Sequence, residues 1–336
     1  MPYHVLIPEN VDSAALDTLS QADEITISAP SKLSREEMVA AIAAADGLII
    51  RSQTQVDGAL LAAAPRLKVV VRAGAGIDNV DLTEATRLGI VVMNTPGGNT
   101  IATAEYAFGL MLALVRHIPA AHQSLAEGRW DRKAFMGTEL SGKTLGIIGF
   151  GRVGRAVASR AVAFDMTVLA YDTQDLEEMA RAAAAIGASL VSLDELYARS
   201  DVVSLHPALN DETRGMINAN SIARMKPGVW IVNAARGALI VEDDLAAAIQ
   251  SGHVAGAALD VYAHEPPSPD HPLLRLPGVI HTPHVAASTR EAQQAVAVQA
   301  AQQMVDALVR GRYTHVQNPQ VFEGHTRMQQ RGDDAT

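Results

Sequence analysis

The chain has 336 residues, of which 48% are hydrophobic and 19% are charged, and it carries no cysteine and a formal net charge of −10 at pH 7. A chain of this length predicts about two domains, and this composition is typical of a globular α/β protein. The negative charge argues against a nucleic-acid-binding surface, and the lack of cysteine excludes disulfides, thiolate nucleophiles and cysteine-ligated zinc.

Short strand-like runs alternate with alanine-rich helical stretches from the first residues onward. The alternation is typical of a parallel sheet with helices on its faces, so we expect a first α/β domain over residues 1–99. Strands are expected at residues 3–8, 24–28, 47–51, 68–72 and 90–94. The apolar run near the N-terminus is too short for a signal peptide and follows no basic segment, so we expect a cytoplasmic protein.

A turn-rich segment, residues 94–99, separates this series from the next one. Thr100 follows as an N-cap candidate for a long apolar stretch at residues 101–121. That stretch carries Glu105, Arg116 and His117 and is rich in alanine. We therefore expect it to form one helix that is buried on most sides, and not a membrane span.

A second series of strands predicts a complete doubly wound sheet, and with it a second domain over residues 100–287. Its strands are expected at residues 144–149, 167–171, 189–191, 202–205, 229–233, 255–261 and 279–282. A helix from residue 288 to about residue 310 cannot bury its apolar face alone, so we expect it to pack back on the first domain. Residues 288–323 then complete the first domain, and residues 324–336 are a polar tail that we expect to be disordered.

Three glycines mark a candidate dinucleotide site. Gly149, Gly151 and Gly154 form a G-x-G-x-x-G turn between an expected strand and an expected helix, where the helix N-terminus can hold a pyrophosphate. Asp172 ends the next expected strand, where a carboxylate would bind the ribose hydroxyls and disfavour a 2′-phosphate. We therefore expect NAD as the cofactor. The structural alternative is a turn that simply packs tightly, with Asp172 as an ordinary strand-end residue.

Three polar residues beyond later strands are candidates for catalysis. Arg236 can hold a carboxylate with paired hydrogen bonds. Histidine is the usual side chain for proton transfer near neutral pH, so His284 can take a hydroxyl proton. Glu265 can fix the histidine tautomer through its other ring nitrogen. Each of these residues alone has a structural alternative, such as a surface ion pair for Arg236.

With these motifs the chain resembles the D-isomer-specific 2-hydroxyacid dehydrogenase family over residues 3–320, and within that family its phosphoglycerate branch. The resemblance implies a Rossmann NAD-binding domain inserted into a flavodoxin-like substrate domain. It also implies a homodimer formed through the NAD-binding domain, with a tetramer as a further possibility. The motifs that carry the resemblance are residues 72–81, 130–154, 232–237, 258–261 and 283–289.

The resemblance implies a role for each matching residue. His284 would be the acid/base, Glu265 would orient it, and Arg236 would bind the carboxylate and the C2 oxygen of the substrate. Asp260 would bind the nicotinamide amide. The implied cofactor contacts are Ala75, Gly149, Gly151, Arg152, Val153, Gly154, Asp172, His206, Pro207, Ala234, Ala235, Arg236, Asp260, His284 and Ala287. The implied substrate contacts are Arg51, Arg72, Ala75, Gly76, Arg132 and Arg236, with Arg132 reaching the site of the neighbouring subunit. No metal is expected.

The expected reaction is the NAD-dependent interconversion of 3-phosphoglycerate and 3-phosphohydroxypyruvate, a step of serine biosynthesis. The alternatives are a glyoxylate or hydroxypyruvate reductase, a sulfolactate-type dehydrogenase and, in another class, an NADH-sensing corepressor-like binding protein. Two departures from the family stand out. Pro207 lacks the threonine that usually precedes it, and the chain stops soon after Pro319, so no serine-binding regulatory domain is expected.

Overall fold

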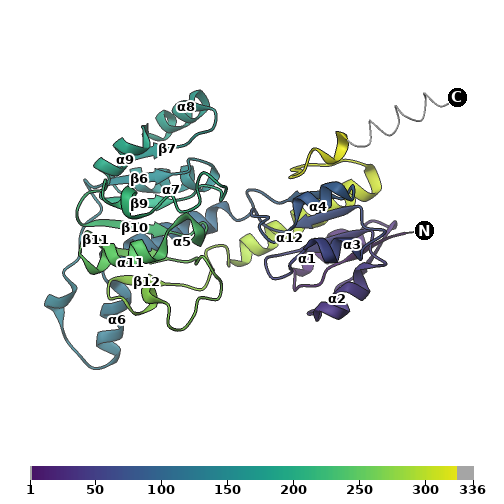
Figure 1. Cartoon of the computed structure of the whole chain (residues 1–336), viewed down its shortest axis with the longest axis horizontal. Coiled ribbons are helices and arrows are strands. Elements are labelled where there is room, and N and C mark those ends of the chain that lie inside the picture. The colour runs from purple at the N-terminus through teal and green to yellow at the C-terminus, as the bar shows by residue number, and fades with distance from the viewer. Residues whose placement is uncertain (1, 324–336) are drawn as a thin grey trace. The chain divides into compact units, whose positions relative to one another are not determined.

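The computed structural model describes residues 2–323, which form two compact units (Figure 1). Unit 1 contains residues up to Asn99 and resumes at Thr289, and unit 2 runs from Thr100 to Ser288. Each unit is built on one sheet in which every strand pair is parallel, and this confirms the predicted fold class. The predicted tail at residues 324–336 lies outside the described residues.

The sheet of unit 1 has five strands in the order β2-β1-β3-β4-β5, the flavodoxin-like arrangement. Every strand lies within two residues of its predicted bounds. The strands are β1 (Tyr3–Leu6), β2 (Ile25–Ser28), β3 (Gly47–Ile50), β4 (Val69–Arg72) and β5 (Val91–Asn94).

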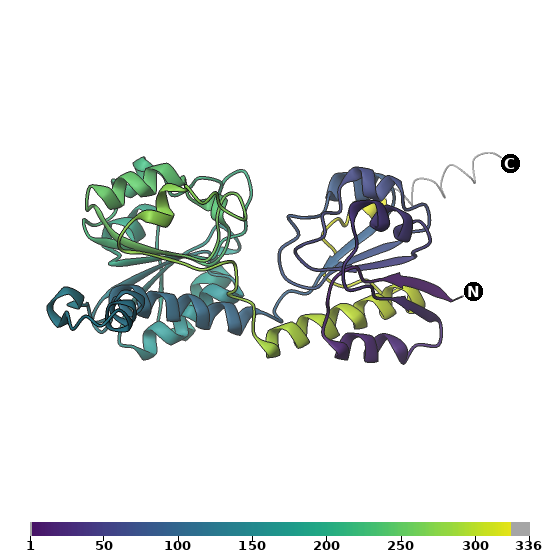
Figure 2. The same cartoon turned by 90° about the horizontal axis from the view of Figure 1, so that it is seen from below.

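Helices cover both faces of the unit 1 sheet. On one face α1 (Ser13–Ser20) and α12 (Arg290–Arg310) bury a common core, and α2 (Arg35–Ile42), α3 (Gly58–Ala62) and α4 (Leu82–Arg87) cover the other. Helix α12 starts two residues later than predicted because the Thr289 side chain caps it. It lies so close to the sheet that a Cβ on Gly47 would approach the Met304 sulfur to 2.5 Å. Figure 2 shows α12 along this face.

The sheet of unit 2 has seven strands in the order β12-β11-β10-β9-β6-β7-β8. The strands are β6 (Thr144–Ile148), β7 (Thr167–Tyr171), β8 (Ser189–Leu190), β9 (Val202–Leu205), β10 (Val229–Asn233), β11 (Val254–Leu259) and β12 (Val279–His281). The chain winds outward from β6 in one direction and from β9 in the other. The point between β6 and β9 is therefore a topological switch point, where open α/β sheets bind their ligands.

The helices of unit 2 also cover both faces of its sheet. One face is covered by α5 (Thr100–Val115), α7 (Arg152–Ala163) and α8 (Leu176–Ile186). The other face is covered by α9 (Leu193–Arg199), α10 (Ala219–Ile222) and α11 (Glu242–Gln250). Short 3₁₀ turns are η1 (Arg132–Phe135), η2 (Gly237–Leu239) and η3 (Pro272–Arg275).

The prediction of a single helix over residues 101–121 is wrong. Helix α5 ends at Val115, and α6 (Ile118–Ala126) leaves it at an angle of 62°. His117 breaks the helix because its backbone is left-handed, with φ 54°, and Pro119 follows in the first turn of α6. Among the described residues no single helix is long and apolar enough to cross a membrane, and only this bent pair meets the criterion by length and composition.

Candidate active site

The turn between β6 and α7 contains the three predicted glycines, and each meets a different steric demand. Gly149 has φ +87°, and a Cβ there would lie 2.4 Å from the Pro207 nitrogen. A Cβ on Gly154 would lie 2.2 Å from the Gly149 carbonyl oxygen, whereas a Cβ on Gly151 would meet no atom of the described residues within 4 Å. Gly149 and Gly154 thus allow the turn, the helix and β9 to pack closely, and the surface over Gly151 is open to a ligand.

Asp172 follows β7 and holds this glycine turn through its carboxylate. Its Oδ2 atom accepts the Phe150 N–H at 2.7 Å. Its Oδ1 atom accepts the N–H groups of Thr173 and Gln174 at 2.8 and 3.0 Å. The half-buried carboxylate therefore sits beside the turn, at the strand end predicted for ribose recognition.

The first turn of α7 has N–H groups without helical partners, as at every α-helix N-terminus. The Arg155 N–H reaches the Gly151 carbonyl at 3.0 Å, and the predicted pyrophosphate contacts Arg152 and Val153 lie before it. The partial positive charge at this end favours an anion. Together with the open surface over Gly151 and the carboxylate of Asp172, this end of the helix fits a dinucleotide.

His206 and Pro207 directly follow β9, on the other side of the switch point. The His206 N–H donates to the Ile148 carbonyl at 2.8 Å, and its Nε2 atom lies 2.9 Å from the Ser204 hydroxyl. Burial lowers the pKa of His206 to about 4, so this imidazole is neutral near pH 7. The backbone of both residues packs against Gly149, which leaves the two loops directly side by side.

The loop after β10 places Arg236 at the same edge of the sheet. The fully buried Asn233 side chain shapes this loop, because it accepts the Ala235 N–H at 3.0 Å and donates to the Arg236 carbonyl at 2.9 Å. The Arg236 guanidinium itself donates to the Ala235 carbonyl at 2.7 Å. Ala234 is buried and Ala235 is half-buried. Asn233 was not among the predicted site residues. The sequence signal for it is its position at the end of a predicted strand, where a polar side chain can hold the following loop.

His284 and Glu265, predicted as a pair from separate loops, meet in unit 2. The Nδ1 atom of His284 lies 2.7 Å from Oε2 of Glu265, and Oε1 of Glu265 accepts the Tyr262 N–H at 3.1 Å. Burial opposes the ionisation of Glu265, but the hydrogen bonds from His284 and Tyr262 and the charge of Arg236 outweigh it and hold the pKa of this carboxyl below its usual value.

The ionised Glu265 decides which nitrogen of His284 can react. A carboxylate only accepts hydrogen bonds, so Nδ1 carries the hydrogen, and Nε2 of the neutral ring is the proton acceptor. The His284 side chain is 44% exposed and that of Glu265 is 37% exposed, so a small molecule can reach the ring. The pair is therefore arranged as a general base with an orienting carboxylate.

Asp260, after β11, is fully buried and holds the loop that carries His284. Its carboxylate accepts the Thr282 hydroxyl at 2.6 Å and the N–H groups of Val285 and Ala286 at 3.0 and 2.8 Å. Its carbonyl accepts the His284 N–H at 2.8 Å. In this structure Asp260, which was predicted to contact the nicotinamide, fixes the loop at residues 282–286 through these hydrogen bonds. Ala287, the last predicted cofactor contact, is half-buried just beyond that loop.

In unit 1, Arg51 follows β3 in a loop held by two residues that sequence reasoning missed. The buried Glu9 carboxylate accepts the N–H groups of Arg51, Gln53 and Thr54 at 3.1, 3.4 and 2.9 Å. The Asn79 side chain donates to the carbonyls of Arg51 and Thr54 at 2.8 and 2.7 Å. The Arg51 guanidinium donates to the Asn10 carbonyl at 3.1 Å. Both partners lie far from Arg51 in sequence, so the pattern around Arg51 did not indicate them.

The neighbouring strand end presents Arg72 and two backbone donors. The Arg72 guanidinium fills the space beside Gly74, where a Cβ would lie 1.9 Å from its Nη1 atom. Asn94 donates to the Ala75 carbonyl at 2.6 Å and shapes this loop. Within residues 2–323 no hydrogen bond uses the N–H of Ala75 or Gly76. These two amides are therefore available to an anion, as predicted for a substrate carboxylate.

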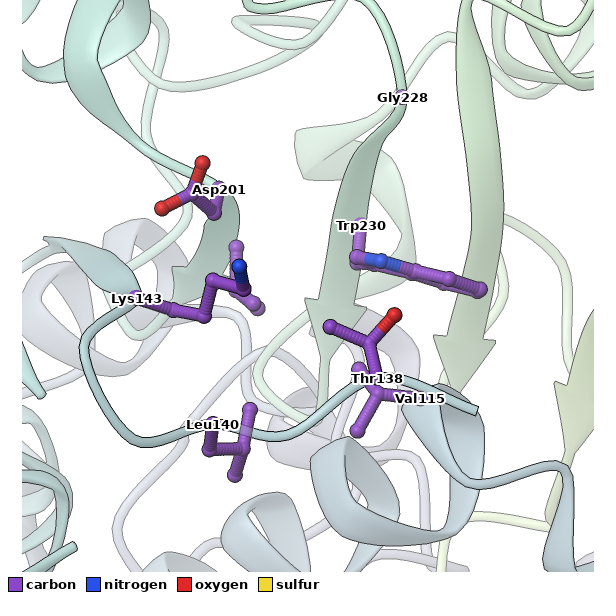
Figure 3. Close-up of a pocket in the computed structure, with 8 residues that line it drawn as sticks. Val115, Thr138, Leu140, Lys143, Asp201, Gly228 and Trp230 are labelled. Atoms are coloured by element: carbon purple, nitrogen blue, oxygen red, sulfur yellow. The ribbon is translucent and has the colours of Figure 1, made fainter. Parts of the chain in front are cut away.

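Arg132 belongs to unit 2, but unlike Asp172 and Arg236 it does not follow a strand. It is exposed at the start of η1, in a segment that continues to Thr138 and Leu140. Those two residues line a cavity of about 170 Å³. Lys143 and Asp201 line one side of this cavity and the Trp230 indole lines another (Figure 3).

That cavity lies at the amino edge of the sheet, because Lys143, Asp201 and Gly228 each precede a strand. Apart from Arg132, the predicted residues of unit 2 lie in the segments that directly follow strands, so they share the carboxyl edge of the sheet. The cavity is therefore not the predicted site. Arg51, Arg72, Ala75 and Gly76 share the carboxyl edge of the unit 1 sheet.

Residues 108–286 match the family model for the NAD-binding domain of D-isomer specific 2-hydroxyacid dehydrogenases. The chain is 49% identical over 302 residues to the D-3-phosphoglycerate dehydrogenase of Archaeoglobus fulgidus, covering 90% of this chain and 56% of that protein. It is 43% identical over 327 residues to the human D-3-phosphoglycerate dehydrogenase, covering 96% of this chain and 60% of that protein. The chain thus spans little more than half the length of these curated relatives.

A solved structure of similar size is the glyoxylate reductase of Paecilomyes thermophila. The two proteins are 32% identical, and the alignment covers 95% of this chain and 99% of that one with a TM-score of 0.84. The likeness therefore extends over both units and is not confined to the dinucleotide-binding sheet.

Proposed function

The chain belongs to the D-isomer specific 2-hydroxyacid dehydrogenase family, and from this premise we propose that it interconverts a small D-2-hydroxy acid and its 2-oxo acid with NAD. The observation that carries the proposal is the 2.7 Å contact between His284 and Glu265 at the carboxyl edge of the unit 2 sheet, beside Arg236. A base with a fixed tautomer next to a carboxylate-binding cation is what oxidation of a hydroxy acid requires.

His284, Glu265 and Arg236 have separate roles in transferring the proton and binding the substrate's charge. In oxidation, Nε2 of His284 takes the hydroxyl proton, and Glu265 stabilises the imidazolium that forms. Arg236 binds the substrate carboxylate and the C2 oxygen. NAD, when bound, supplies the acceptor for the hydride that leaves C2. In the reverse direction the protonated His284 returns its proton to the carbonyl oxygen.

We assign the cofactor contacts to the loops at the switch point. The free N–H groups at the start of α7 and the open surface over Gly151 fit the pyrophosphate, and Asp172 fits the adenosine ribose. Asp172 presents a negative charge where NADP would carry its 2′-phosphate, which supports a preference for NAD. Three protein groups already donate hydrogen bonds to the Asp260 carboxylate. Asp260 would therefore bind the nicotinamide amide through the acceptor positions that these bonds leave open.

We propose 3-phosphoglycerate and 3-phosphohydroxypyruvate, the pair used in serine biosynthesis, as substrate and product. The free amides of Ala75 and Gly76 suit a carboxylate, and Arg51 and Arg72 supply cations for a second anionic group. The names of the two curated relatives described above, both D-3-phosphoglycerate dehydrogenases, support the same pair. Because this acid and NAD are charged and do not cross membranes unaided, we propose a cytoplasmic location.

We further propose a homodimer formed through unit 2. Apolar side chains stand exposed on the segment from α6 to η1, and exposed patches of this kind mark protein interfaces. Trp130 is 76% exposed and Met136 is 81% exposed, with Ile118 and Leu125 on the adjoining helix also exposed. Arg132 lies within the same segment, which would let it serve a site of the second subunit.

The test is a substrate panel followed by NADH absorbance. Purified protein is assayed against 3-phosphohydroxypyruvate, hydroxypyruvate, glyoxylate and sulfopyruvate, and light scattering gives the oligomeric state. We expect the highest kcat/KM with 3-phosphohydroxypyruvate and a mass of two chains. A higher kcat/KM with glyoxylate would reject the phosphorylated substrate. Inactivity with every acid, alongside tight NADH binding, would favour a cofactor-sensing binding protein.

A further inference from the structure

Glu242, the first residue of α11, makes two contacts that the proposed reaction does not assign. Its Oε1 atom accepts the Ala263 N–H at 3.0 Å, and its Oε2 atom lies 3.1 Å from Nε2 of His271. The side chains of Glu242 and His271 are only 19% and 15% exposed. These contacts join the start of α11 to the loop that follows β11, and that loop carries Glu265.

The peptide that Glu242 binds also rests against a glycine. A Cβ on Gly237 would lie 1.9 Å from the carbonyl carbon of Tyr262 and 2.4 Å from the nitrogen of Ala263. Gly237 directly follows Arg236 in the chain. The peptide between Tyr262 and Ala263 is thus packed on the backbone next to Arg236, and the Glu242 carboxylate binds its N–H.

The ring of His271 completes the support behind this peptide. Its Nε2 atom carries the hydrogen, because its partner Glu242 only accepts. The ring meets that of Tyr262 edge to face, with centroids 5.7 Å apart. The Tyr262 hydroxyl lies 3.0 Å from Nδ1 of His281, the last residue of β12. Tyr262 is therefore held at its backbone, at its ring and at its hydroxyl.

Glu265 depends on the same short segment. Its Oε1 atom accepts the Tyr262 N–H, and its Oε2 atom meets Nδ1 of His284. A shift of the 262–265 loop would therefore move the carboxylate away from the histidine. We propose that Glu242 is a positioning residue that holds this loop, so that Glu265 meets His284 in the geometry needed for proton transfer. The catalytic part of this inference rests on the proposed function, whereas the restraint on the loop does not.

The experiment compares three variants of the full-length protein. Glu242→Ala removes both contacts, and Glu242→Gln keeps an acceptor for the Ala263 N–H. Asp243→Ala is the matched control, because Asp243 is also acidic and in the first turn of α11 but is exposed. Hydrogen exchange read by mass spectrometry on peptides spanning residues 258–271 reports the loop. Steady-state kinetics and NADH binding report the site.

We expect Glu242→Ala to exchange faster in this loop and to lose about 10- to 100-fold in kcat, since small misplacements of catalytic groups cost that much. Its NADH affinity should stay near the wild-type value, because the loops assigned to the pyrophosphate and the adenosine ribose follow β6 and β7 and make no contact with Glu242. Glu242→Gln should have a loop exchange rate and a kcat between those of wild type and Glu242→Ala. Asp243→Ala should match wild type. A merely structural residue would lower the melting temperature without this selective loss of kcat.

A double-mutant cycle with Glu265→Gln tests the route of the effect. If Glu242 acts through Glu265, adding Glu242→Ala to Glu265→Gln should cause little further loss of kcat. Additive losses would overturn the inference, as would unchanged exchange or unchanged kcat in Glu242→Ala. A wild-type protein inactive toward every acid would refute the proposed function, and the exchange measurement would then decide on its own whether Glu242 restrains the loop.

Discussion

At the scale of single residues, His284 combines an unusual backbone with a fixed tautomer. Its φ of 54° is left-handed, a conformation that asparagine tolerates well. His284→Asn should therefore keep the backbone while removing the base, and we expect turnover to fall by about 10²- to 10⁴-fold. Fluorescence titration should show that the variant still binds NADH. Turnover close to that of wild type would remove His284 from the mechanism.

Asp172 is the residue on which the preference for NAD rests. Its carboxylate would repel a 2′-phosphate, so the wild-type protein should use NADH far better than NADPH. Asp172→Asn removes the charge and retains an acceptor for the Phe150 N–H. We expect this variant to have a smaller ratio of kcat/KM with NADH to kcat/KM with NADPH, mainly because kcat/KM with NADPH increases. Equal efficiency with both cofactors in the wild type would contradict the role given to Asp172.

His206 links the stability of the switch-point loops to pH. Burial lowers its folded-state pKa from the ordinary 6.5 to about 4. Between these values the unfolded chain binds a proton that the folded chain does not, so the free energy of unfolding should fall as the pH drops through this window. His206→Gln should lose that part of the pH dependence. Urea denaturation at pH 7 and pH 5 measures this dependence, and identical pH slopes for both proteins would argue against a neutral imidazole in the folded state.

At the scale of elements, the loop after β12 is held mainly by one carboxylate. Thr282 donates its hydroxyl to the fully buried Asp260, and two amides of the same loop donate to that carboxylate as well. Thr282→Val removes one donor from a buried charge and should lower the free energy of unfolding by about 1–3 kcal/mol. Thr282→Ser keeps the hydroxyl and serves as the control. Chemical denaturation measures both, and equal stability of the two variants would mean that the hydroxyl contributes nothing.

At the scale of the whole molecule, the proposed dimer makes a prediction about shared sites. If Arg132 serves the partner subunit, Arg132→Ala should weaken a phosphorylated substrate about 10- to 100-fold, as loss of a charge-assisted bond would. Hydroxypyruvate, which lacks the phosphate, should be little affected. Because Arg132 is exposed on η1, the substitution should leave the stability of unit 2 unchanged.

Mixing two variant subunits tests whether Arg132 serves the site of its own subunit or that of the partner subunit. After verified exchange, a heterodimer of Arg132→Ala and His284→Asn chains should contain one complete site, with His284 from the first chain and Arg132 from the second. The mixture should recover activity on 3-phosphohydroxypyruvate above that of either variant alone. Activity equal to the average of the two separate variants would reject the shared site.

The sequence alone determined the strands and the loops that hold most of the site. The alternation of strand-like runs, turn residues and helical stretches predicted every strand of both sheets to within two residues. The inner strands gave the clearest signal, because a strand buried on both faces must be apolar along its length. The candidate residues Asp172, Arg236 and His284 were found because each follows such a run. In parallel sheets these ends share one edge, so order along the chain was enough to indicate that edge.

Only the tertiary structure decided which side chains hold those loops. Glu9 binds the Arg51 loop from 42 residues away, Glu242 binds Ala263 from 21 residues away, and Thr282 meets Asp260 across 22 residues. These pairings depend on strand order and register, which the periodicity of a single strand does not specify. The break at His117 was likewise decided by the tertiary structure. An apolar run indicates that a segment is buried, whereas the direction of the chain beyond Val115 depends on what that segment packs against.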